Sequence, residues 1–406
     1  METYPLAANT FGPQEIEAAK SVLDSGHFTM GAQVRAFERE FAEWTGLRHA
    51  LMVNSGSSAN LVAVDALLRR SHGPGPLKAG DEVLVSGLSW PTTVWPLAQL
   101  GLVPVFVDTN PETLALDLNS AKQALTEKTR GMFVVPVLGR VPNMAEYQAF
   151  CSAHGLTLIE DCCESLGAFS QGQHTGSFGK MGTFSFYFSH HISTIEGGMV
   201  VTNDSELYDD LLSLRAHGWL RDRSDKAAWC DRFPEIDERF LFVMGGYNVR
   251  PTDIQGAIGR VQLKRLNSML DARERLATRV HGWVASSIPW LRLIGSECLP
   301  SEGRVHARTE RQHSWMTLPF LVADDAPLKK REVSQLLEKA GVETRPIIAG
   351  NLARHPASAR FNTRAVDDMS VCDKLLDQGF MIGCHPERSA GALETLERAF
   401  SVLGGL

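Results

Sequence analysis

The stretch that decides the fold covers residues 184–200 and reads F-S-F-Y-F-S-H-H-I-S-T-I-E-G-G-M-V. The alternating apolar residues at its start predict a strand. A polar turn with two adjacent histidines, His190 and His191, follows this strand. The two glycines Gly197 and Gly198 then lead into a second apolar run, which predicts another strand. The stretch therefore indicates a buried sheet with reactive side chains in the turn between two of its strands.

Outward from this stretch, residues 48–215 alternate short apolar runs with helical patterns. This alternation is typical of an α/β fold with a large, mostly parallel sheet and helices on both of its faces. The expected strands are 50–53, 83–85, 103–107, 132–137, 156–159, 184–187 and 199–201. The expected helices are 59–70, 94–100, 144–153 and 206–217.

The C-terminal part of the chain has a different pattern. Residues 224–238 are polar and charged with little periodicity, so we predict a surface excursion there. A long helix is expected from 253 to about 288, followed by elements at 314–322, 329–340, 369–378 and 391–402. We therefore predict a large α/β domain over residues 1–252 and a smaller α+β domain over residues 253–406.

Composition excludes several classes of protein. The 406 residues carry a net charge of -7, which gives no reason to expect nucleic acid or an anionic membrane as a partner. The N-terminus lacks the basic and apolar regions of a signal peptide, and no apolar run approaches the ~20 residues of a membrane span. The seven cysteines have no paired spacing, which argues against a disulfide framework. We expect a cytoplasmic protein.

Two candidate site segments follow strands of the predicted sheet. The run N-S-G-S-S-A-N at 54–60 contains Gly56 and Ser57, and amides at a helix N-terminus can bind a phosphate. By itself this run is weak evidence, and a simple helix cap would be the better interpretation. Trp90 lies at the sheet edge where α/β enzymes place ligands, and there it can stack on a planar ring. A tryptophan is more often a packed core residue, so the position of Trp90, and not its residue type, supports a role in binding.

A third segment, I-E-D-C-C-E-S at 159–165, contains Asp161 and Glu164. A buried carboxylate such as Asp161 can keep a ring nitrogen protonated, and Glu164 could bond a ring hydroxyl. A helix cap is an equally good interpretation of Asp161 alone. His190 alone would be a satisfied structural histidine. The order of four segments (phosphate turn, stacking Trp, Asp-x-x-Glu, and Ser185 before His190) favours a site.

These segments resemble the DegT-type family of sugar aminotransferases, which are fold-type I enzymes that use pyridoxal 5'-phosphate (PLP). The resemblance also includes Y-P-L-A at 4–7, F-T-M-G at 28–31, R-A-H-G-W at 215–219, Y-N-V-R-P at 247–251 and R-P-I-I-A-G-N at 345–351. It implies that Ser57 and Ser185 bind the cofactor phosphate beside Gly56, that Trp90 stacks on the ring and that Asp161 meets the ring nitrogen.

On the substrate side, the resemblance implies roles for five residues: Phe28, His217, Arg221, Arg250 and Arg345. It also implies that Asn248 reaches the cofactor phosphate of a second subunit, so that a homodimer shares its active sites.

His190 stands where most of the family keeps the lysine that forms a Schiff base with the cofactor. An imidazole is not a primary amine and cannot form that bond. The resemblance is therefore to the 3-dehydratase branches, with PLP or pyridoxamine 5'-phosphate (PMP) bound non-covalently and His190 as the base. It implies a nucleotide-linked 4-keto-6-deoxyhexose as substrate, GDP-4-keto-6-deoxymannose in first place. L-glutamate then regenerates PMP.

One branch with the histidine also carries an iron–sulfur cluster bound by closely spaced cysteines. Between Arg221 and Tyr247 this chain has only Cys230, whereas such a cluster needs about four thiolates. We therefore expect neither a cluster nor another metal, which favours the GDP-sugar branch. A 3-dehydratase acting on another nucleotide sugar stays open, because no base-reading motif is visible in the sequence. Two further alternatives also stay open. One is an aminotransferase that uses another lysine, with Lys180 nearest in sequence. The other is a catalytically silent relative that binds cofactor or sugar.

Overall fold

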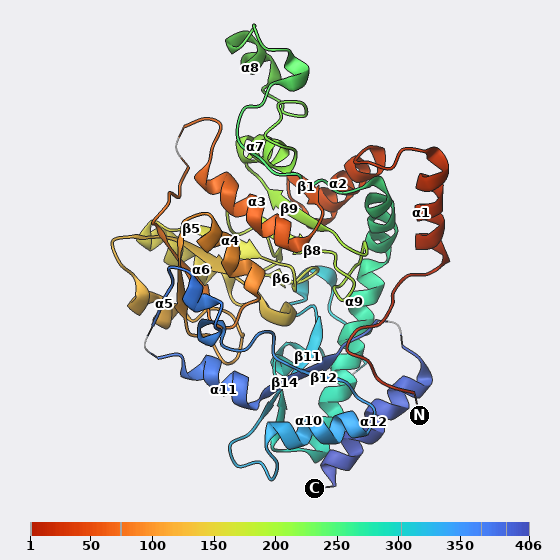
Figure 1. Ribbon diagram of the computed structural model, residues 1–406. Coiled ribbons are helices and arrows are strands. Elements are labelled where there is room, and N and C mark those ends of the chain that lie inside the picture. The colour runs from red at the N-terminus through yellow and green to blue at the C-terminus, as the bar shows by residue number, and fades with distance from the viewer. Residues whose placement is uncertain (1, 74, 302, 367, 387, 406) are drawn as a thin grey trace.

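The computed structural model describes residues 2–73, 75–301, 303–366, 368–386 and 388–405 (Figure 1). Its larger sheet has eight strands in the order β1-β9-β8-β5-β4-β2-β3-β13. These strands are β1 (His49–Val53), β2 (Glu82–Ser86), β3 (Val103–Val107), β4 (Thr129–Val134), β5 (Thr157–Asp161), β8 (Gly182–Ser185), β9 (Gly198–Thr202) and β13 (Arg364–Ala365). β9 runs antiparallel to both of its neighbours, and the other pairs are parallel. The prediction of a mostly parallel sheet is confirmed.

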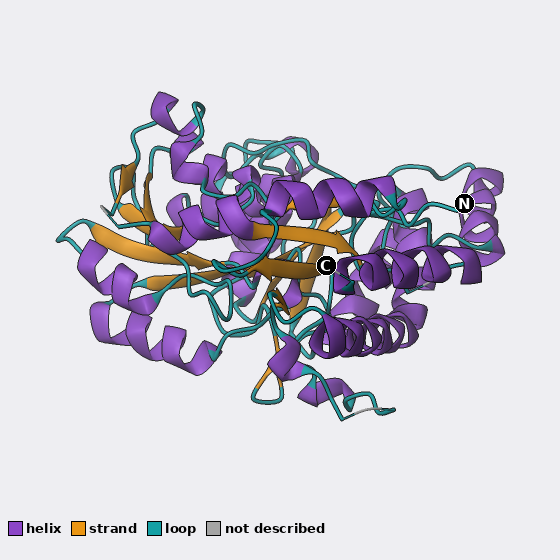
Figure 2. Ribbon diagram, turned by 90° about the horizontal axis from the view of Figure 1, so that it is seen from below, coloured by secondary structure: helices purple, strands orange, loops and turns teal. Residues whose placement is uncertain are grey.

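Helices lie on both faces of this sheet, above and below the strands in Figure 2. They include α3 (Gly56–Leu68), α4 (Pro91–Gln99), α5 (Leu118–Ala124), α6 (Met144–His154) and α7 (Ser205–Arg215). Local chemistry sets where they begin. Asp204 caps α7, because its side chain accepts hydrogen bonds from the first amides of that helix. Pro91 starts α4, where its missing N–H costs nothing.

The second sheet lies at the other end of a long helix, α9 (Asp253–Ser287), which runs down the molecule in Figure 1. It is antiparallel, in the order β10-β11-β14-β12, with α10, α11 and α12 around it. The bounds are β10 (Leu291–Leu293), β11 (Thr317–Val322), β12 (Thr344–Pro346), β14 (Gly379–Gly383), α10 (Lys330–Lys339), α11 (Ser370–Gln378) and α12 (Ala390–Gly404). These elements make the predicted smaller α+β unit.

Several connections cross the predicted division at residue 252, among them one strand pair and one side-chain hydrogen bond. The strand β13 comes from the C-terminal part of the chain and pairs in parallel with β3 of the larger sheet. In the opposite direction, the hydroxyl of Tyr4 donates to the carbonyl of Gly383 at 2.9 Å. The assignment of 1–252 and 253–406 to two domains stays a prediction.

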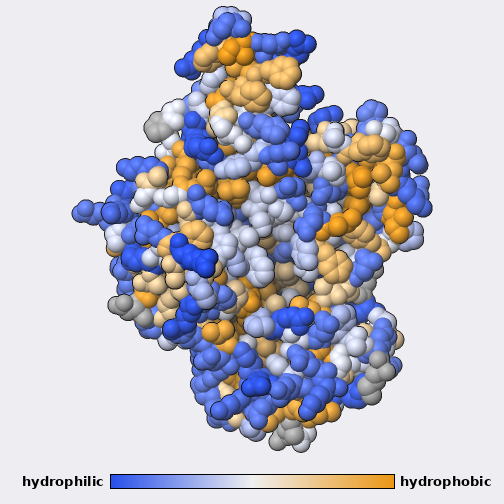
Figure 3. Space-filling view, in the orientation of Figure 1, coloured by the Kyte–Doolittle hydropathy of each residue, from blue (hydrophilic) through white to orange (hydrophobic). Residues whose placement is uncertain are grey.

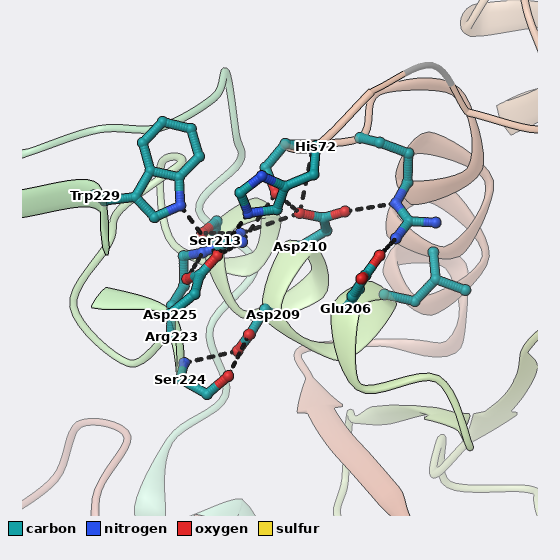
Figure 4. Close-up of polar contacts among 12 residues, drawn as sticks. His72, Glu206, Asp209, Asp210, Ser213, Arg223, Ser224, Asp225 and Trp229 are labelled. Carbon is teal, nitrogen blue, oxygen red and sulfur yellow. Dashed lines mark hydrogen bonds and ion pairs between the residues drawn. The ribbon is translucent and has the colours of Figure 1, made fainter. Parts of the chain in front are cut away.

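The predicted excursion at 224–238, here called the arm, contains the short helix α8 (Lys226–Arg232) and projects at the top of Figure 1. Hydrophobic and hydrophilic side chains lie side by side on this projection (Figure 3). Arg223 anchors its base through buried ion pairs to Asp210 (3.0 Å) and Asp225 (2.7 Å), as Figure 4 shows. The Ser224 hydroxyl donates to Asp209 at 2.5 Å. The arm is therefore firmly attached to α7 despite its polar sequence.

Several predicted boundaries differ from the structure. The run predicted as one strand over 132–137 ends as β4 at Val134, and a 3-10 turn (Val137–Gly139) follows. The strand predicted over 184–187 ends at Ser185, so the turn that carries the histidines starts earlier. The elements that were not expected include the helices α1 (Pro13–Ser25) and α2 (Ala32–Thr45), the hairpin of β6 (Phe169–Ser170) and β7 (Gln173–His174), and the short edge strand β13. Among the described residues, no helix is both long and apolar enough to cross a bilayer.

Candidate active site

The turn between β1 and α3 forms a cradle closed by Ser185 of β8. The Ser55 hydroxyl caps α3 by accepting from the amide of Ser58 at 3.1 Å. A Cβ atom at Gly56 would lie 2.5 Å from the Cβ of Ser185 and 2.9 Å from its hydroxyl oxygen. The Ser57 side chain, next in sequence, is exposed. The first amides of a helix lack intrahelical acceptors, so this cradle suits an anion such as a phosphate.

Asp161 ends β5, and its carboxylate is held by hydrogen bonds from three sides. One oxygen accepts from Asn60 (2.8 Å) and from the Thr93 hydroxyl (2.7 Å). The other accepts from the amide of Cys163 at 3.1 Å. The Asn60 side chain is fixed in turn, because its oxygen accepts from the Thr183 hydroxyl at 2.6 Å. The network therefore holds a buried carboxylate in one orientation beside the cradle.

Sequence reasoning missed Asn60 and Thr93 as members of this site. Asn60 ends the candidate run at 54–60, and Thr93 lies three residues after Trp90. Each is buried, and a buried polar side chain is expected to be hydrogen-bonded. A polar residue about one helical turn after a predicted phosphate turn is the signal that could have found Asn60.

His190 lies in the turn after β8, where its amide donates to the carbonyl of Tyr187 at 3.0 Å. Its Nδ1 atom is buried and has no hydrogen-bond partner among the described residues. Burial and the charge of Arg273 lower the pKa of His190 to about 4, against the opposing effect of a hydrogen bond with the Cys163 backbone. His190 is therefore a neutral imidazole at pH 7, with a ring nitrogen free to take a proton.

Cys163 brings the three parts of the site together. Its backbone contacts His190 and Asp161, and its sulfur would lie 3.1 Å from a Cβ atom at Gly56. The cradle, the oriented carboxylate and the free imidazole therefore surround one small region of the sheet edge. The next histidine faces elsewhere: His191 is buried and its Nε2 bonds the carbonyl of Ser314 at 3.1 Å. The described residues contain no group of three or more His, Cys, Asp or Glu side chains placed to hold a metal.

Glu164 and Trp90 border the same region. One Glu164 oxygen accepts from the amide of Leu138 at 2.7 Å. Burial, and secondarily the charge of Asp161, raise the pKa of Glu164 to about 8, so this carboxyl is largely protonated at neutral pH and can donate. Trp90 precedes α4 with 55% of its surface exposed, and its carbonyl accepts from the amide of Thr93. Its indole is thus open to a ligand close to the residue that holds Asp161.

The predicted substrate residues divide into two groups. His217 and Asn248 lie on adjacent backbone, because Ala216 and Asn248 form an antiparallel bridge. Arg250 joins them by donating to the Asn248 side-chain oxygen at 2.9 Å. Arg221 lies near this group, with its guanidinium 5.6 Å from the centre of the Trp219 ring.

Phe28 and Arg345 lie on other elements. The Phe28 carbonyl accepts from the amide of Asp253 at the start of α9. Arg345 is on β12 and donates to its neighbour's carbonyl at 2.7 Å. Both side chains are exposed. The roles of all these residues towards cofactor and substrate stay predictions.

Comparison with known proteins identifies the family. A model described as the DegT/DnrJ/EryC1/StrS aminotransferase family matches residues 9–400. The chain belongs to this family. Its resemblance to the family, expected from the motifs, is confirmed over nearly its whole length.

Among family members, the chain is 36% identical to GDP-4-keto-6-deoxy-D-mannose 3-dehydratase of Yersinia pseudotuberculosis, over 99% of this chain and 98% of the relative. It is 37% identical to the protein of the same name from Escherichia coli, over 95% of this chain and 96% of the relative. A crystal structure of GDP-4-keto-6-deoxymannose-3-dehydratase with a trapped PLP-glutamate geminal diamine superposes with a TM-score of 0.86 at 35% identity, covering 98% of this chain and 100% of that one. The fold is thus that of a PLP-dependent enzyme.

Proposed function

We propose that this protein is a PLP/PMP-dependent 3-dehydratase that removes the C3 hydroxyl of a nucleotide-linked 4-keto-6-deoxyhexose, GDP-4-keto-6-deoxymannose. Glutamate supplies the amino group that regenerates PMP. The observation that carries the proposal is His190, a neutral imidazole with an unpartnered nitrogen that contacts the same Cys163 backbone as the Asp161 carboxylate. The relatives named as 3-dehydratases, similar over nearly the full length of both chains, support it.

The residues present fit a PLP or PMP molecule. Gly56, Ser57 and Ser185 would hold its phosphate, since a Cβ atom at Gly56 would fill the space between α3 and Ser185. Asp161 would keep the pyridine nitrogen protonated, and Trp90 would cover the ring face. Glu164 would bond the ring hydroxyl. When bound, the cofactor supplies an electron sink for the substrate carbons next to its nitrogen.

His190 moves the proton in this proposal. The imidazole cannot form a covalent tether, so the cofactor is bound by non-covalent contacts alone. With the cofactor bound, His190 would take the proton lost from the cofactor's C4′ carbon through its free nitrogen and then, as imidazolium, would give that proton to the oxygen leaving C3. Hydroxide is a poor leaving group, and its protonation to water makes the departure feasible. Overall, the sugar and glutamate give a 3-deoxy ketone, 2-oxoglutarate and ammonia.

Around this chemistry, Phe28, His217, Arg221, Arg250 and Arg345 would bind the nucleotide sugar, and the arginines would pair with its diphosphate. Asn248 would reach the cofactor phosphate of a second subunit in a homodimer. We propose that no iron–sulfur cluster takes part, since the sequence between Arg221 and Tyr247 has Cys230 as its one cysteine and such a cluster needs about four thiolates. All seven cysteines are unpaired, which is typical of the cytoplasm.

The alternative function is a sugar aminotransferase in which another lysine binds the cofactor. Lys180 precedes β8 and is exposed, and its carbonyl accepts from the Thr202 hydroxyl at 2.9 Å. It therefore lies at the start of the strand, whereas Ser185 ends the strand at the cradle. Its location favours the dehydratase.

The deciding experiment supplies the protein with GDP-4-keto-6-deoxymannose and glutamate and reads the products by mass. We expect a 3-deoxy ketone with equal amounts of 2-oxoglutarate and ammonia, and no product from a His190→Asn variant. Recovery of a 4-amino-4,6-dideoxy sugar as the main product would make the aminotransferase assignment correct instead.

A further inference from the structure

Residues 247–249 form a short extended segment that is bonded to two others. The amide of Tyr247 donates to the carbonyl of Leu214 at 2.7 Å, and the carbonyl of Tyr247 accepts from the amide of His217 at 2.6 Å. The carbonyl of Val249 accepts from the amide of Asn54 at 2.9 Å, immediately before the cradle. One segment thus joins the backbone of His217 to the turn that begins α3.

The side chain of Tyr247 fixes this segment to the far part of α3. Its hydroxyl donates to Asp65 at 2.8 Å and accepts from Arg69 at 3.1 Å. Arg69 also bonds Asp65 directly, with its Nε at 2.5 Å, and the Asp65 side chain is fully buried. Burial and the contact with Asp65 raise the pKa of Tyr247 to about 12, so the phenol remains a donor at neutral pH.

Side chains along an extended segment point alternately to opposite sides, and this sets the direction of the side chain of Asn248, which lies between Tyr247 and Val249 in sequence. Tyr247 and Val249 pack against the hydrophobic cluster that includes α3, so the side chain between them, Asn248, points the other way and is exposed.

His217 is held in a conformation that it would not adopt by itself. Its φ of 65° lies in the left-handed region, which is unfavourable for a residue with a side chain. Such a conformation persists only where the surroundings enforce it. The bond from the His217 amide to the Tyr247 carbonyl is one of those constraints.

We propose that Tyr247, held by Asp65 and Arg69, is a positioning residue that fixes His217 on the substrate side of the site and Asn248 where it would reach the cofactor phosphate of a second subunit. The inference rests on the proposed function for the roles of those two residues. Tyr247 touches neither ligand in this scheme. It acts through its main chain, which bonds His217 directly and carries Asn248 as the next residue.

The test is the Tyr247→Phe variant, which keeps the ring and removes only the hydroxyl. Loss of a hydrogen bond to a charged group commonly changes an equilibrium constant about ten-fold or more. We therefore expect amide hydrogen exchange at His217, Tyr247 and Val249 to accelerate about ten-fold. The KM for the nucleotide sugar should rise by about the same factor while kcat changes little, because binding geometry is lost and the proton-transfer group is untouched.

The matched control is Tyr208→Phe on α7. The Tyr208 ring stacks on His49 at 4.4 Å, and no hydrogen bond of its hydroxyl is found within the described part of the chain. It should change neither exchange at His217 nor KM. Should Tyr247→Phe fail to fold, Arg69→Gln carries the test, since the Arg69 side chain is half exposed. Arg69→Gln should accelerate hydrogen exchange less than Tyr247→Phe does, but at the same amides.

Unchanged exchange and KM in Tyr247→Phe, or equal changes in Tyr208→Phe, would overturn the inference. If Tyr247→Phe accelerates exchange as expected but the wild-type protein yields no 3-deoxy ketone, the proposed function alone is refuted. In that case the exchange data still decide whether Tyr247 holds the backbone of His217 and Val249.

Discussion

The substitution Gly56→Ala tests the cradle with a single methyl group. The added Cβ atom would lie 2.5 Å from the Cβ of Ser185 and 3.1 Å from the sulfur of Cys163, whereas ordinary contacts are 3.4–4 Å. Relief requires Ser185 and α3 to separate by roughly 1 Å, and overpacking of this kind costs about 1–3 kcal/mol. In the protein without PLP, the strain is relieved when the cradle changes shape. Binding must then restore the strained shape, so affinity for the cofactor phosphate falls by about 5- to 150-fold.

The assay is an equilibrium titration with PLP, followed by absorbance, together with thermal unfolding of the protein without PLP. The matched control is Gly282→Ala in α9, where an added Cβ atom meets nothing within 4 Å. That change should stabilise the protein by about 0.5–1 kcal/mol, because glycine is a poor helix former, and should leave PLP affinity unchanged. A Gly56→Ala protein that binds PLP as tightly as wild type would refute the reasoning, since the cradle could then not depend on the close approach of α3 and β8.

Three further outcomes are expected. His174 accepts from the amide of Gly167 at 3.0 Å, and burial, with the charge of Arg308, lowers its pKa from 6.5 to about 3. The neutral His174 ring therefore contributes its full stability above pH 6.5, and this contribution is lost as the pH falls below 6.5. The free energy of unfolding in urea should rise by about 1.4 kcal/mol less between pH 5.5 and pH 7.5 in His174→Gln than in wild type. Arg223→Met should lower the free energy of unfolding by about 3 kcal/mol, because it leaves Asp210 with one fewer cation in a buried network; a loss under about 1 kcal/mol would mean that Arg70 compensates. His190→Lys should give a pyridoxyl-lysine at position 190 after borohydride reduction and peptide mapping, whereas wild type should give none at any lysine, Lys180 included.

The long apolar runs made the larger sheet predictable. Val103–Val107 was expected residue for residue, and the other buried strands within a few positions, because strands buried on both faces carry continuous apolar sequences. β13 was missed for the opposite reason. It has two residues, and its partner Val105 is far away in sequence, so no local pattern marks it.

The candidate site was predictable where one residue type carries the chemistry. His190, Asp161 and Gly56 were named from their segments, and the structure brings all three around Cys163. Asn60 and Cys163 were not named, because their contributions depend on which neighbours folding brings to them. An amide or a thiol in a sequence has no signature that separates a support for a catalytic group from a core residue.

The pairing of β13 with β3 also bears on how the chain is made. A ribosome delivers residues in order, and β1 to β9 are complete by Thr202. The outer edge of β3 nevertheless stays unpaired until Arg364 of β13 has been synthesised. Arg364 also bonds Glu82 on β2 at 3.0 Å. The hydroxyl of Tyr4 waits still longer, for the carbonyl of Gly383. During synthesis the nascent chain must therefore carry an open strand edge and an unanchored N-terminus until nearly all of it has emerged. That is the period in which unpaired strand edges invite aggregation, and when a chaperone has most to protect.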